Sequence, residues 1–389
     1  MAGGCSAVGE DQRRGVGGPQ ALTWERSSNT WSVGSRLSLP GGAPPTDVSV
    51  LSDVSCSYSQ TCAAVGGYAR GPSVALTPMV TREVHGVFSQ AVALPVPKGY
   101  APTSSSGGTG SSQLVWCQYL PISRCIVVGG LTKPGHGAVG EFSAMLALDA
   151  TWSGWRSATA VIPSALPSGI GTNTHEQINS ISCADVIDCL MVGSLNATHD
   201  PGLPITQVER HGVWGPIHVA PLPSDFASAD LTGPEGTLTS VSCPDSQRPL
   251  VAMSCVAVGW YHSVAGPLKP LVETFASMAW SVGTAPSMPV YELQSVYCEA
   301  FHTVFCVATG IASGLSGGTV EFVAHGTPSG FAVASKVADF PVATPPGSAR
   351  WLTSIACPSI SYSCISTGME VVGSGIDAVV VPVDGRAIA

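Results

Sequence analysis

The chain has 389 residues, of which 44% are hydrophobic and only 11% are charged, and its formal net charge is −9. A typical soluble domain is about 25% charged. With only 16 Lys and Arg residues, the sequence lacks the basic surplus of a nucleic-acid-binding protein. Its hydrophobicity excludes a disordered chain, and no apolar run reaches the roughly 18 residues of a membrane-spanning helix. A turn-rich globular protein remains, because Gly and Pro are abundant.

Thirteen cysteines reveal an internal repeat. After Cys5 they fall into six close pairs, and the first members of successive pairs lie 55 to 66 residues apart. A phrase such as INSISC or LTSVSC leads to the first cysteine of a pair, and a glycine stands four residues after every second cysteine. The paired cysteines are Cys56 and Cys62, Cys117 and Cys125, Cys183 and Cys189, Cys243 and Cys255, Cys298 and Cys306, and Cys357 and Cys364. A repeat of this length indicates an array of similar structural units.

Each repeat predicts four short strands in chain order. The alternation of apolar and small polar residues before the first cysteine predicts a half-buried strand, and the apolar stretch after the second cysteine predicts a fully buried one. A third apolar run ends in a turn signal such as His-Gly or Asp-Gly. The fourth strand opens with an aromatic residue, which we expect to fill the space between repeats. These aromatic residues are Trp31, Phe88, Trp155, Trp214, Trp280 and Phe331.

The predicted fold class is all-β, as a β-propeller of seven blades with four antiparallel strands each and an incomplete first blade. A single four-stranded blade cannot bury both of its faces, so neighbouring blades must stack on it. We expect one propeller domain over 1–389 and a monomer. A six-bladed ring with loose ends is the alternative. The expected repeat units are approximately 1–47, 48–111, 112–175, 176–236, 237–291, 292–347 and 348–389.

The paired cysteines are expected to form disulfides. Each pair brackets the hairpin between the first two strands, where facing residues of an antiparallel pair are close enough for a disulfide. Six such bonds predict an oxidising compartment, so we expect a secreted or cell-envelope protein. Zinc is the rival reading, but its sites need four clustered ligands, and these pairs stand far apart in the sequence. We therefore expect no metal and no cofactor.

Cys5 has no partner in the sequence. The phrase CSAVGE around it matches the second half of a cysteine pair, whose first half would precede Met1. We therefore expect that the chain begins inside a repeat and that the missing strand and an export signal lie further upstream. A lipid anchor on Cys5 is the alternative, but it would need a preceding apolar segment.

These phrases resemble the Cys-paired repeat of uncharacterised secreted or cell-wall proteins of actinobacteria. That repeat has the pattern L-x-x-V-S-C, then C-x-A-V-G, and later E-R and W-S, which match 238–259, Glu25-Arg26, Glu209-Arg210 and Trp280-Ser281. The resemblance spans essentially the whole chain, and it implies a secreted propeller without implying a reaction. There is a looser similarity to sialidase-type (Asp-box) repeats at RSSNTW and LDATWSGW, from which no catalytic residue can be transferred.

Propellers place ligand sites on the loops that join strands two and three, and these loops hold much of the limited charge of this chain. We expect candidate binding residues there. They are Tyr68, Arg70, Lys133, His136, His199, Asp200, Trp260, Tyr261 and His262. The aromatic members of the set could stack on a sugar ring. Three of the residues, His136, His199 and His262, could form a metal site with Asp200, but flexible loops rarely converge by chance.

Residues for catalysis are few. Glutamates recur on the third strand of successive repeats, and pairing with a neighbouring arginine is the expected role. They are Glu25, Glu83, Glu209, Glu273 and Glu321. The sequence contains none of the common nucleophile, metalloprotease or phosphate-loop motifs, and glycosidase chemistry would require two carboxylates at a fixed separation.

The predicted function is therefore an extracellular binding module that presents its loop rim to a glycan, a peptide or an envelope component without catalysis. The alternative is a secreted carbohydrate-active hydrolase or lyase, and sugar release that depends on Asp200 or Glu370 would identify it. Nucleic acid and a membrane span are not expected.

Overall fold

A computed structural model describes residues 5–11, 18–25, 30–42, 49–57, 61–69, 76–84, 87–96, 98, 101–102, 113–117, 125–132, 143–144, 147–149, 156–157, 174–185, 188–197, 202–211, 213–227, 236–244, 254–286, 290–300, 304–313, 319–336, 350–357, 363–372 and 375–384. The chain divides into two compact units. Unit 1 comprises Met1–Ser164 and Thr172–Val186, and unit 2 comprises Ala165–Gly171 and Ile187–Ala389. Within the described residues, the regular structure is β-strand apart from one short 3-10 turn, η2 (Pro40–Gly42).

Unit 1 contains three antiparallel sheets and one further strand. The first sheet has β1 (Cys5–Asp11), β2 (Gly18–Glu25) and β3 (Thr30–Arg36). The second has β4 (Ser49–Ser57), β5 (Thr61–Tyr68), β6 (Thr77–Val84), β7 (Val87–Phe88) and β8 (Val92–Ala93). The third has β9 (Ala101–Pro102), β10 (Gln113–Cys117), β11 (Cys125–Thr132), β12 (Ser143–Ala144), β13 (Ala147–Asp149) and β14 (Arg156–Ser157), and β15 (Thr174–Asp185) follows.

Unit 2 continues the same pattern. Its first strands are β16 (Asp188–Ala197), β17 (Leu203–Arg210), β18 (Val213–Trp214) and β19 (His218–Val219). Next come β20 (Gly236–Ser242), β21 (Ser254–His262), β22 (Leu268–Ala276) and β23 (Ala279–Val282). Then follow β24 (Val290–Ala300), β25 (Val304–Ser313), β26 (Thr319–Thr327) and β27 (Gly330–Lys336). The last sheet has β28 (Arg350–Ala356), β29 (Ser363–Val372) and β30 (Gly375–Asp384).

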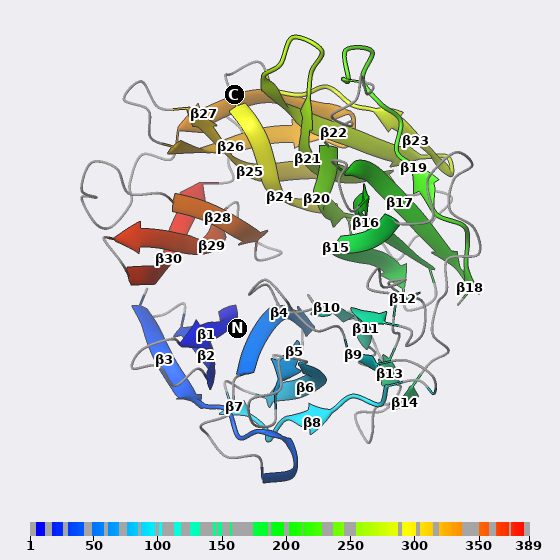
Figure 1. The fold of residues 1–389 in the computed structure, drawn as a ribbon. Helices are drawn as coiled ribbons and strands as arrows, with labels where there is room; N and C mark the ends of the chain where they lie inside the picture. Colours follow the sequence, from blue (N-terminus) through cyan, green and yellow to red (C-terminus); the bar gives the residue numbers. More distant parts are fainter. Residues whose placement is uncertain are drawn as a thin grey trace. The chain divides into compact units, whose positions relative to one another are not determined.

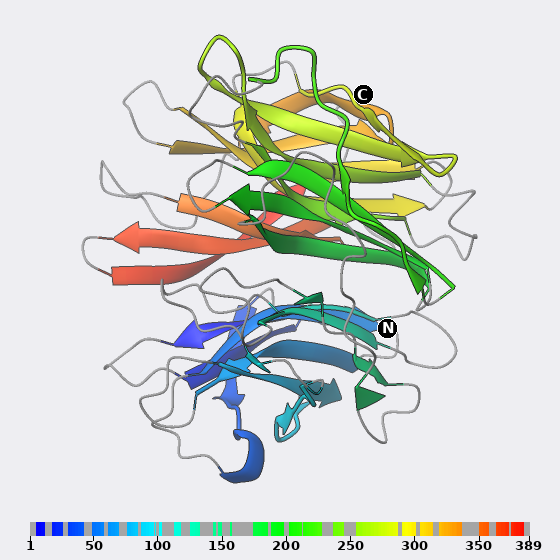
Figure 2. The ribbon, with the colours of Figure 1, turned by 45° about the vertical axis from the view of Figure 1, so that its right-hand side comes forward.

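These sheets have the architecture of β-propeller blades. Consecutive strands are antiparallel neighbours in sheets such as β20–β21–β22–β23 and β24–β25–β26–β27, and these two sheets lie in successive layers of unit 2 (Figure 1). Figure 2 shows the same layers from a second direction. The all-β propeller class predicted from the sequence is confirmed. The number of blades, the closure of a ring and the single-domain boundaries stay predictions.

Apolar side chains fill the space between these layers of unit 2. Val258 and Val272 of one sheet share a buried cluster with Leu293, Phe322 and Phe331 of the next. Phe331 opens the fourth strand of its repeat and is only 1% exposed. The role predicted for this aromatic residue, to fill the space beside the neighbouring sheet, is therefore confirmed here.

A β-bulge explains the leucine and the glycine of the repeated phrase. In the pairing of β20 with β21, Leu238 stands opposite Gly259, and the register then shifts before Ser240. The shift brings the partner backbone so close that a Cβ on Gly259 would lie 1.9 Å from the carbonyl oxygen of Thr237. The same arrangement recurs at Gly66, where a Cβ would lie 1.9 Å from a backbone carbonyl oxygen. Glycine is therefore required at this position because the bulge leaves no room for a side chain.

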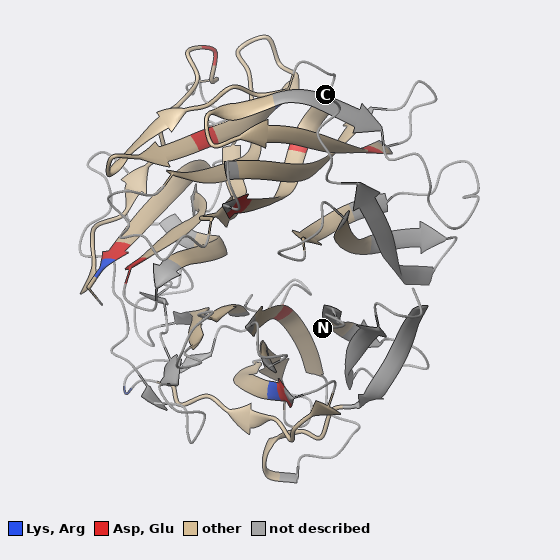
Figure 3. Cartoon of the chain, turned by 180° about the vertical axis from the view of Figure 1, so that it is seen from behind, with Lys and Arg blue, Asp and Glu red and all other residues tan. Residues whose placement is uncertain are grey.

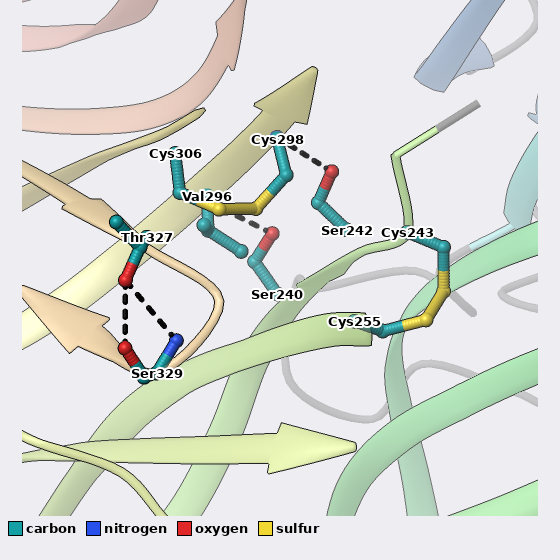
Figure 4. The surroundings of a disulfide bond; sticks show 9 residues. All are labelled: Ser240, Ser242, Cys243, Cys255, Val296, Cys298, Cys306, Thr327 and Ser329. Carbon is teal, nitrogen blue, oxygen red and sulfur yellow. Dashed lines mark hydrogen bonds between the residues drawn. A yellow bond between two sulfur atoms is a disulfide. The ribbon is translucent and has the colours of Figure 1, made fainter. Parts of the chain in front are cut away.

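Serines of the phrase connect neighbouring sheets. The N–H of Val296 donates to Ser240 Oγ at 3.2 Å, and the N–H of Cys298 donates to Ser242 Oγ at 2.8 Å (Figure 4). The side chains of one innermost strand thus accept hydrogen bonds from the backbone of the next innermost strand. A buried backbone N–H needs such an acceptor, so the repeated S-x-S-C pattern has a structural cause.

Unit 1 contains the same pair of hydrogen bonds between neighbouring strands, but one serine acceptor is replaced by an aspartate. The N–H of Cys117 donates to Ser55 Oγ at 2.9 Å, and the N–H of Val115 donates to Asp53 Oδ2 at 2.8 Å. Asp53 therefore occupies the place that Ser240 takes in unit 2. Burial raises the pKa of Asp53 to about 7, although the backbone N–H donors of Val115 and Val54 lower it.

The predicted disulfides are confirmed. In four of five bonds the Cα atoms are 3.9 to 4.1 Å apart, and in the Cys243–Cys255 bond they are 4.3 Å apart. The other four of these bonds join Cys56 to Cys62, Cys117 to Cys125, Cys298 to Cys306 and Cys357 to Cys364. Cys183 and Cys189 are also disulfide-bonded. These bonds indicate an oxidising environment.

Candidate functional site

The structure describes four of the nine predicted binding residues. Tyr68 is only 3% exposed and belongs to a core cluster with Leu37, Leu39 and Met79, so its ring is not available on the surface. The other three lie at the end of β21. The remaining candidates, Arg70, Lys133, His136, His199 and Asp200, lie outside the described residues, and so does the proposed metal site that needs three of them.

The end of β21 divides its three candidates between the two faces of the sheet. Successive residues of a strand point to opposite faces, so Trp260 and His262 share one face and Tyr261 occupies the other. The rings of Trp260 and His262 meet edge to face, with their centroids 6.0 Å apart. Tyr261 is 6% exposed and its ring stacks on Phe226 at 5.8 Å. The three rings therefore do not form one platform for a sugar.

Asp225 connects this strand end to the preceding loop, and no pattern in the sequence marks this residue. Tyr261 Oη donates to Asp225 Oδ1 at 2.8 Å, and Lys269 Nζ donates to Asp225 Oδ2. Tyr261 and Lys269 are partners in the register of β21 and β22, which places both donors on one side of the sheet. The hydrogen bond from Lys269, and then that from Tyr261, hold the pKa of Asp225 below its usual value. The carboxylate therefore stays ionised and positions the loop.

The end of the last hairpin brings two acidic residues together. Glu370 of β29 is the register partner of Asp377 of β30, and on its other side Glu370 is the partner of Arg350 of β28. A basic residue and two acidic residues therefore stand in one row across three adjacent strands. Glu370 was predicted as a candidate from the sequence and Asp377 was not, because strand register decides which residues are partners.

Acidic residues are sparse elsewhere on the described strands (Figure 3). Three of the recurring third-strand glutamates do not occupy equivalent places. Glu83 stands opposite Cys62, Glu273 opposite Ala257, and Glu321 opposite Ile311. Their spacing in the sequence therefore does not mark one repeated site.

Glu273 is the most isolated of the buried glutamates. It is 0% exposed, and neither carboxylate oxygen has a hydrogen-bond partner among the described residues. Burial raises the pKa of Glu273 to about 8, so its carboxyl group is protonated at neutral pH. A neutral carboxylic acid is far less costly to bury than a carboxylate, which explains how this position tolerates glutamate.

Metal-binding clusters and membrane-spanning helices are both absent from the described residues. No group of three or more His, Cys, Asp or Glu residues that could hold a metal ion occurs within the described ranges. Among the same residues, no helix has the length and apolar character needed to cross a membrane.

Comparisons with known proteins show a likeness of fold. No family model matches the chain, and no curated protein matches it. A Penicillium chrysogenum alpha-L-arabinanase complexed with arabinobiose is 9% identical, with a TM-score of 0.48 over 87% of this chain and 94% of that chain. A mutant of Trypanosoma rangeli sialidase displaying trans-sialidase activity is 8% identical, with a TM-score of 0.48 over 98% and 52%. The fucose-specific lectin from Aleuria aurantia is 9% identical, with a TM-score of 0.39 over 86% and 96%.

These comparisons correct one prediction. A binding module without catalysis was predicted from the sequence, with an enzyme as the alternative. The similar structures include proteins named as an arabinanase, an arabinofuranosidase and a sialidase. The propeller fold therefore gives no reason to exclude catalysis, and the prediction of a non-catalytic module is wrong. The resemblance to the actinobacterial repeat stays a prediction.

Proposed function

We propose that the protein is a carbohydrate-active hydrolase in which Glu370 and Asp377 supply the two carboxyl groups. The observation that carries the proposal is the register of β29 and β30, which sets these residues opposite each other. The chain has only 25 acidic residues in 389. Acidic residues are therefore scarce, and two of them are register partners near the end of this hairpin.

The backbone register of this pair is compatible with glycoside hydrolysis. Directly opposed residues of antiparallel strands have Cβ atoms about 4.5–5.5 Å apart. Glycosidases that retain the anomeric configuration have carboxyl groups about 5–5.5 Å apart, and one acts as a nucleophile while the other donates and then accepts a proton. We assign these two roles to Glu370 and Asp377, which are register partners.

The proposed setting is outside the cell or in the envelope. The disulfides support an oxidising compartment, where polysaccharides and glycoproteins are the available glycans. We propose secretion and a glycan partner on this basis. We also propose that the repeats form one propeller domain, because stacking against both neighbours is what buries each blade.

Reducing-sugar release from a panel of glycans tests the proposal. The panel should include arabinan, galactan, polygalacturonate and a sialylated glycoprotein. Wild-type protein should release sugar from at least one of them, and E370Q and D377N should each lower the rate by roughly 10²–10⁴-fold, the range for a group that transfers a proton in the transition state. Glu299 lies at the far end of β24 and is half-buried, so E299Q is the matched control and should retain activity.

Two results would overturn the assignment. If oxidised, folded protein releases no sugar from any glycan of the panel, the proposed hydrolase activity is contradicted. Full activity of both E370Q and D377N would show that other residues carry out the reaction. With an active enzyme, the anomeric configuration of the first product, followed by NMR, should be that of the substrate.

A further inference from the structure

A pocket on the outer strands of unit 2 is separate from the proposed catalytic row. It has a volume of about 510 Å³ and lies between the segment from β17 to β19 and the hairpin of β22 and β23. Its lining residues are Thr206, Val208, Arg210, Val213, Gly215, Pro216, His218, Val219, Pro221, Phe275, Met278 and Trp280. Small-molecule sites usually occupy about 300–1,000 Å³, so the volume suits one or two sugar rings.

Two residues that line the pocket are almost fully buried. Thr206 is 2% exposed and Phe275 is 1% exposed. The ring of Phe275 packs against the ring of Trp280 with centroids 5.1 Å apart. These two residues are also register partners in β22 and β23. A fixed aromatic wall of this kind provides a flat face on which the apolar side of a ring can rest.

The rim carries a guanidinium. Arg210 is exposed at the end of β17, and its side chain makes no hydrogen bond or ion pair with another described residue. The hairpin that bears it is held in place, because the N–H of His211 donates to Asp188 Oδ1 at 3.0 Å. Lys and Arg together number only 16 in the chain. An arginine beside an aromatic wall therefore gives this pocket a charge that most of the surface lacks.

We propose that this pocket binds an acidic sugar residue, with the ring against Trp280 and the carboxylate at Arg210. A planar guanidinium pairs with a carboxylate through two parallel hydrogen bonds. The carboxylate is assigned from Arg210 alone, and only the choice of a sugar as the ring rests on the proposed function. The pocket serves as a second contact that holds an acidic glycan chain on the protein.

Calorimetric titration with tri-galacturonate and with its methyl ester tests the proposal. The titrations use full-length E370Q, in which the proposed hydrolysis is removed. The acid should bind roughly tenfold more tightly than the ester, the factor expected for one charge-assisted contact at a partly exposed site. R210Q in this background should lose that preference by weakening the acid while leaving the ester unchanged. K98Q removes an exposed positive charge in unit 1 and should change neither affinity.

A second variant changes only an exposed side chain at the rim of the pocket. Val213 lies at the rim and is 70% exposed, so V213D leaves the fold intact and sets a negative charge beside Arg210. It should weaken the acid and spare the ester. Equal binding of acid and ester, no binding of either, or equal effects of R210Q and K98Q would overturn the proposal. These results are independent of sugar release, so a failure of the hydrolase and a failure of the pocket are distinguishable.

Discussion

The backbone N–H of Cys298 donates to Ser242 Oγ at 2.8 Å, although the two residues belong to different sheets and are 56 positions apart. Ser242 directly precedes the first cysteine of its own repeat. Its hydroxyl oxygen accepts the hydrogen bond from the first cysteine of the next repeat. The same relationship joins Ser55 to Cys117 in unit 1. In these two cases, the serine before the first cysteine links its repeat to the following one.

Replacing Ser242 with alanine should therefore destabilise unit 2. The change leaves the N–H of Cys298 buried without its acceptor, which costs about 1–3 kcal/mol. Urea unfolding monitored by circular dichroism measures the loss. Ser281 is exposed, and S281A should stay within about 0.5 kcal/mol of wild type. Equal stability of S242A and wild type would show that the bond between the sheets contributes nothing.

Replacing Gly259 with alanine should have a larger effect. The new Cβ would lie 1.9 Å from the carbonyl oxygen of Thr237, so the bulge would have to move. We expect a loss of about 3 kcal/mol or more, in the range of severe backbone and packing defects. G9A is the control, because no atom of the described residues lies within 4 Å of a Cβ at this position. A thermal midpoint of G259A close to that of G9A would contradict the role assigned to the bulge.

Asp53 should make unit 1 sensitive to pH. Its folded-state pKa of about 7 lies above the ordinary value of 3.8. Between these values the folded state holds more protons than the unfolded state, so the free energy of unfolding falls as pH rises through this window. D53S places here the residue that unit 2 has at Ser240 and keeps an acceptor for Val115. It should raise the thermal midpoint by a few degrees at pH 8 and much less at pH 4. A constant difference between D53S and wild type across this range would refute the titration.

Glu273 predicts a second pH effect, in unit 2. Its pKa of about 8 in the folded state exceeds the ordinary 4.5. The free energy of unfolding therefore also falls as pH rises through that window. E273Q keeps the size of the side chain and cannot ionise. The thermal midpoint of E273Q should therefore exceed that of wild type at pH 9 and approach it at pH 4. A wild-type midpoint that rises between pH 5 and 8 relative to E273Q would contradict the sign.

The disulfides should contribute separately to stability. Removing Cys243 and Cys255 together as serines opens a short loop, and the chain-entropy model gives a loss of about 2–3 kcal/mol. Denaturant unfolding of the double variant against wild type measures it. Reduced wild-type protein should lose more than the double variant, because every bond is then open. Equal stability of reduced and oxidised protein would contradict the structural role.

The sequence by itself determined the repeat, the order of strands in each sheet and the cysteine pairs. This was possible because these features depend on local patterns: the alternation of apolar residues, the turn glycines and the closeness of two cysteines around one hairpin. It also marked Leu238 and Gly259 as special, although the reason appeared only with the bulge. Tyr261 and Trp260 were expected in a loop, but they belong to β21 and point to opposite faces of the sheet.

Only the tertiary structure decided which residues meet. Asp225 reaches Tyr261 and Lys269 from a separate loop, Glu370 stands opposite Asp377, and Arg210 shares a pocket with Trp280 of the next sheet. Contacts of this kind depend on strand register and on the packing of one sheet against another. A shift of one residue in register would exchange the two faces of a strand, and composition and spacing carry no information about that choice.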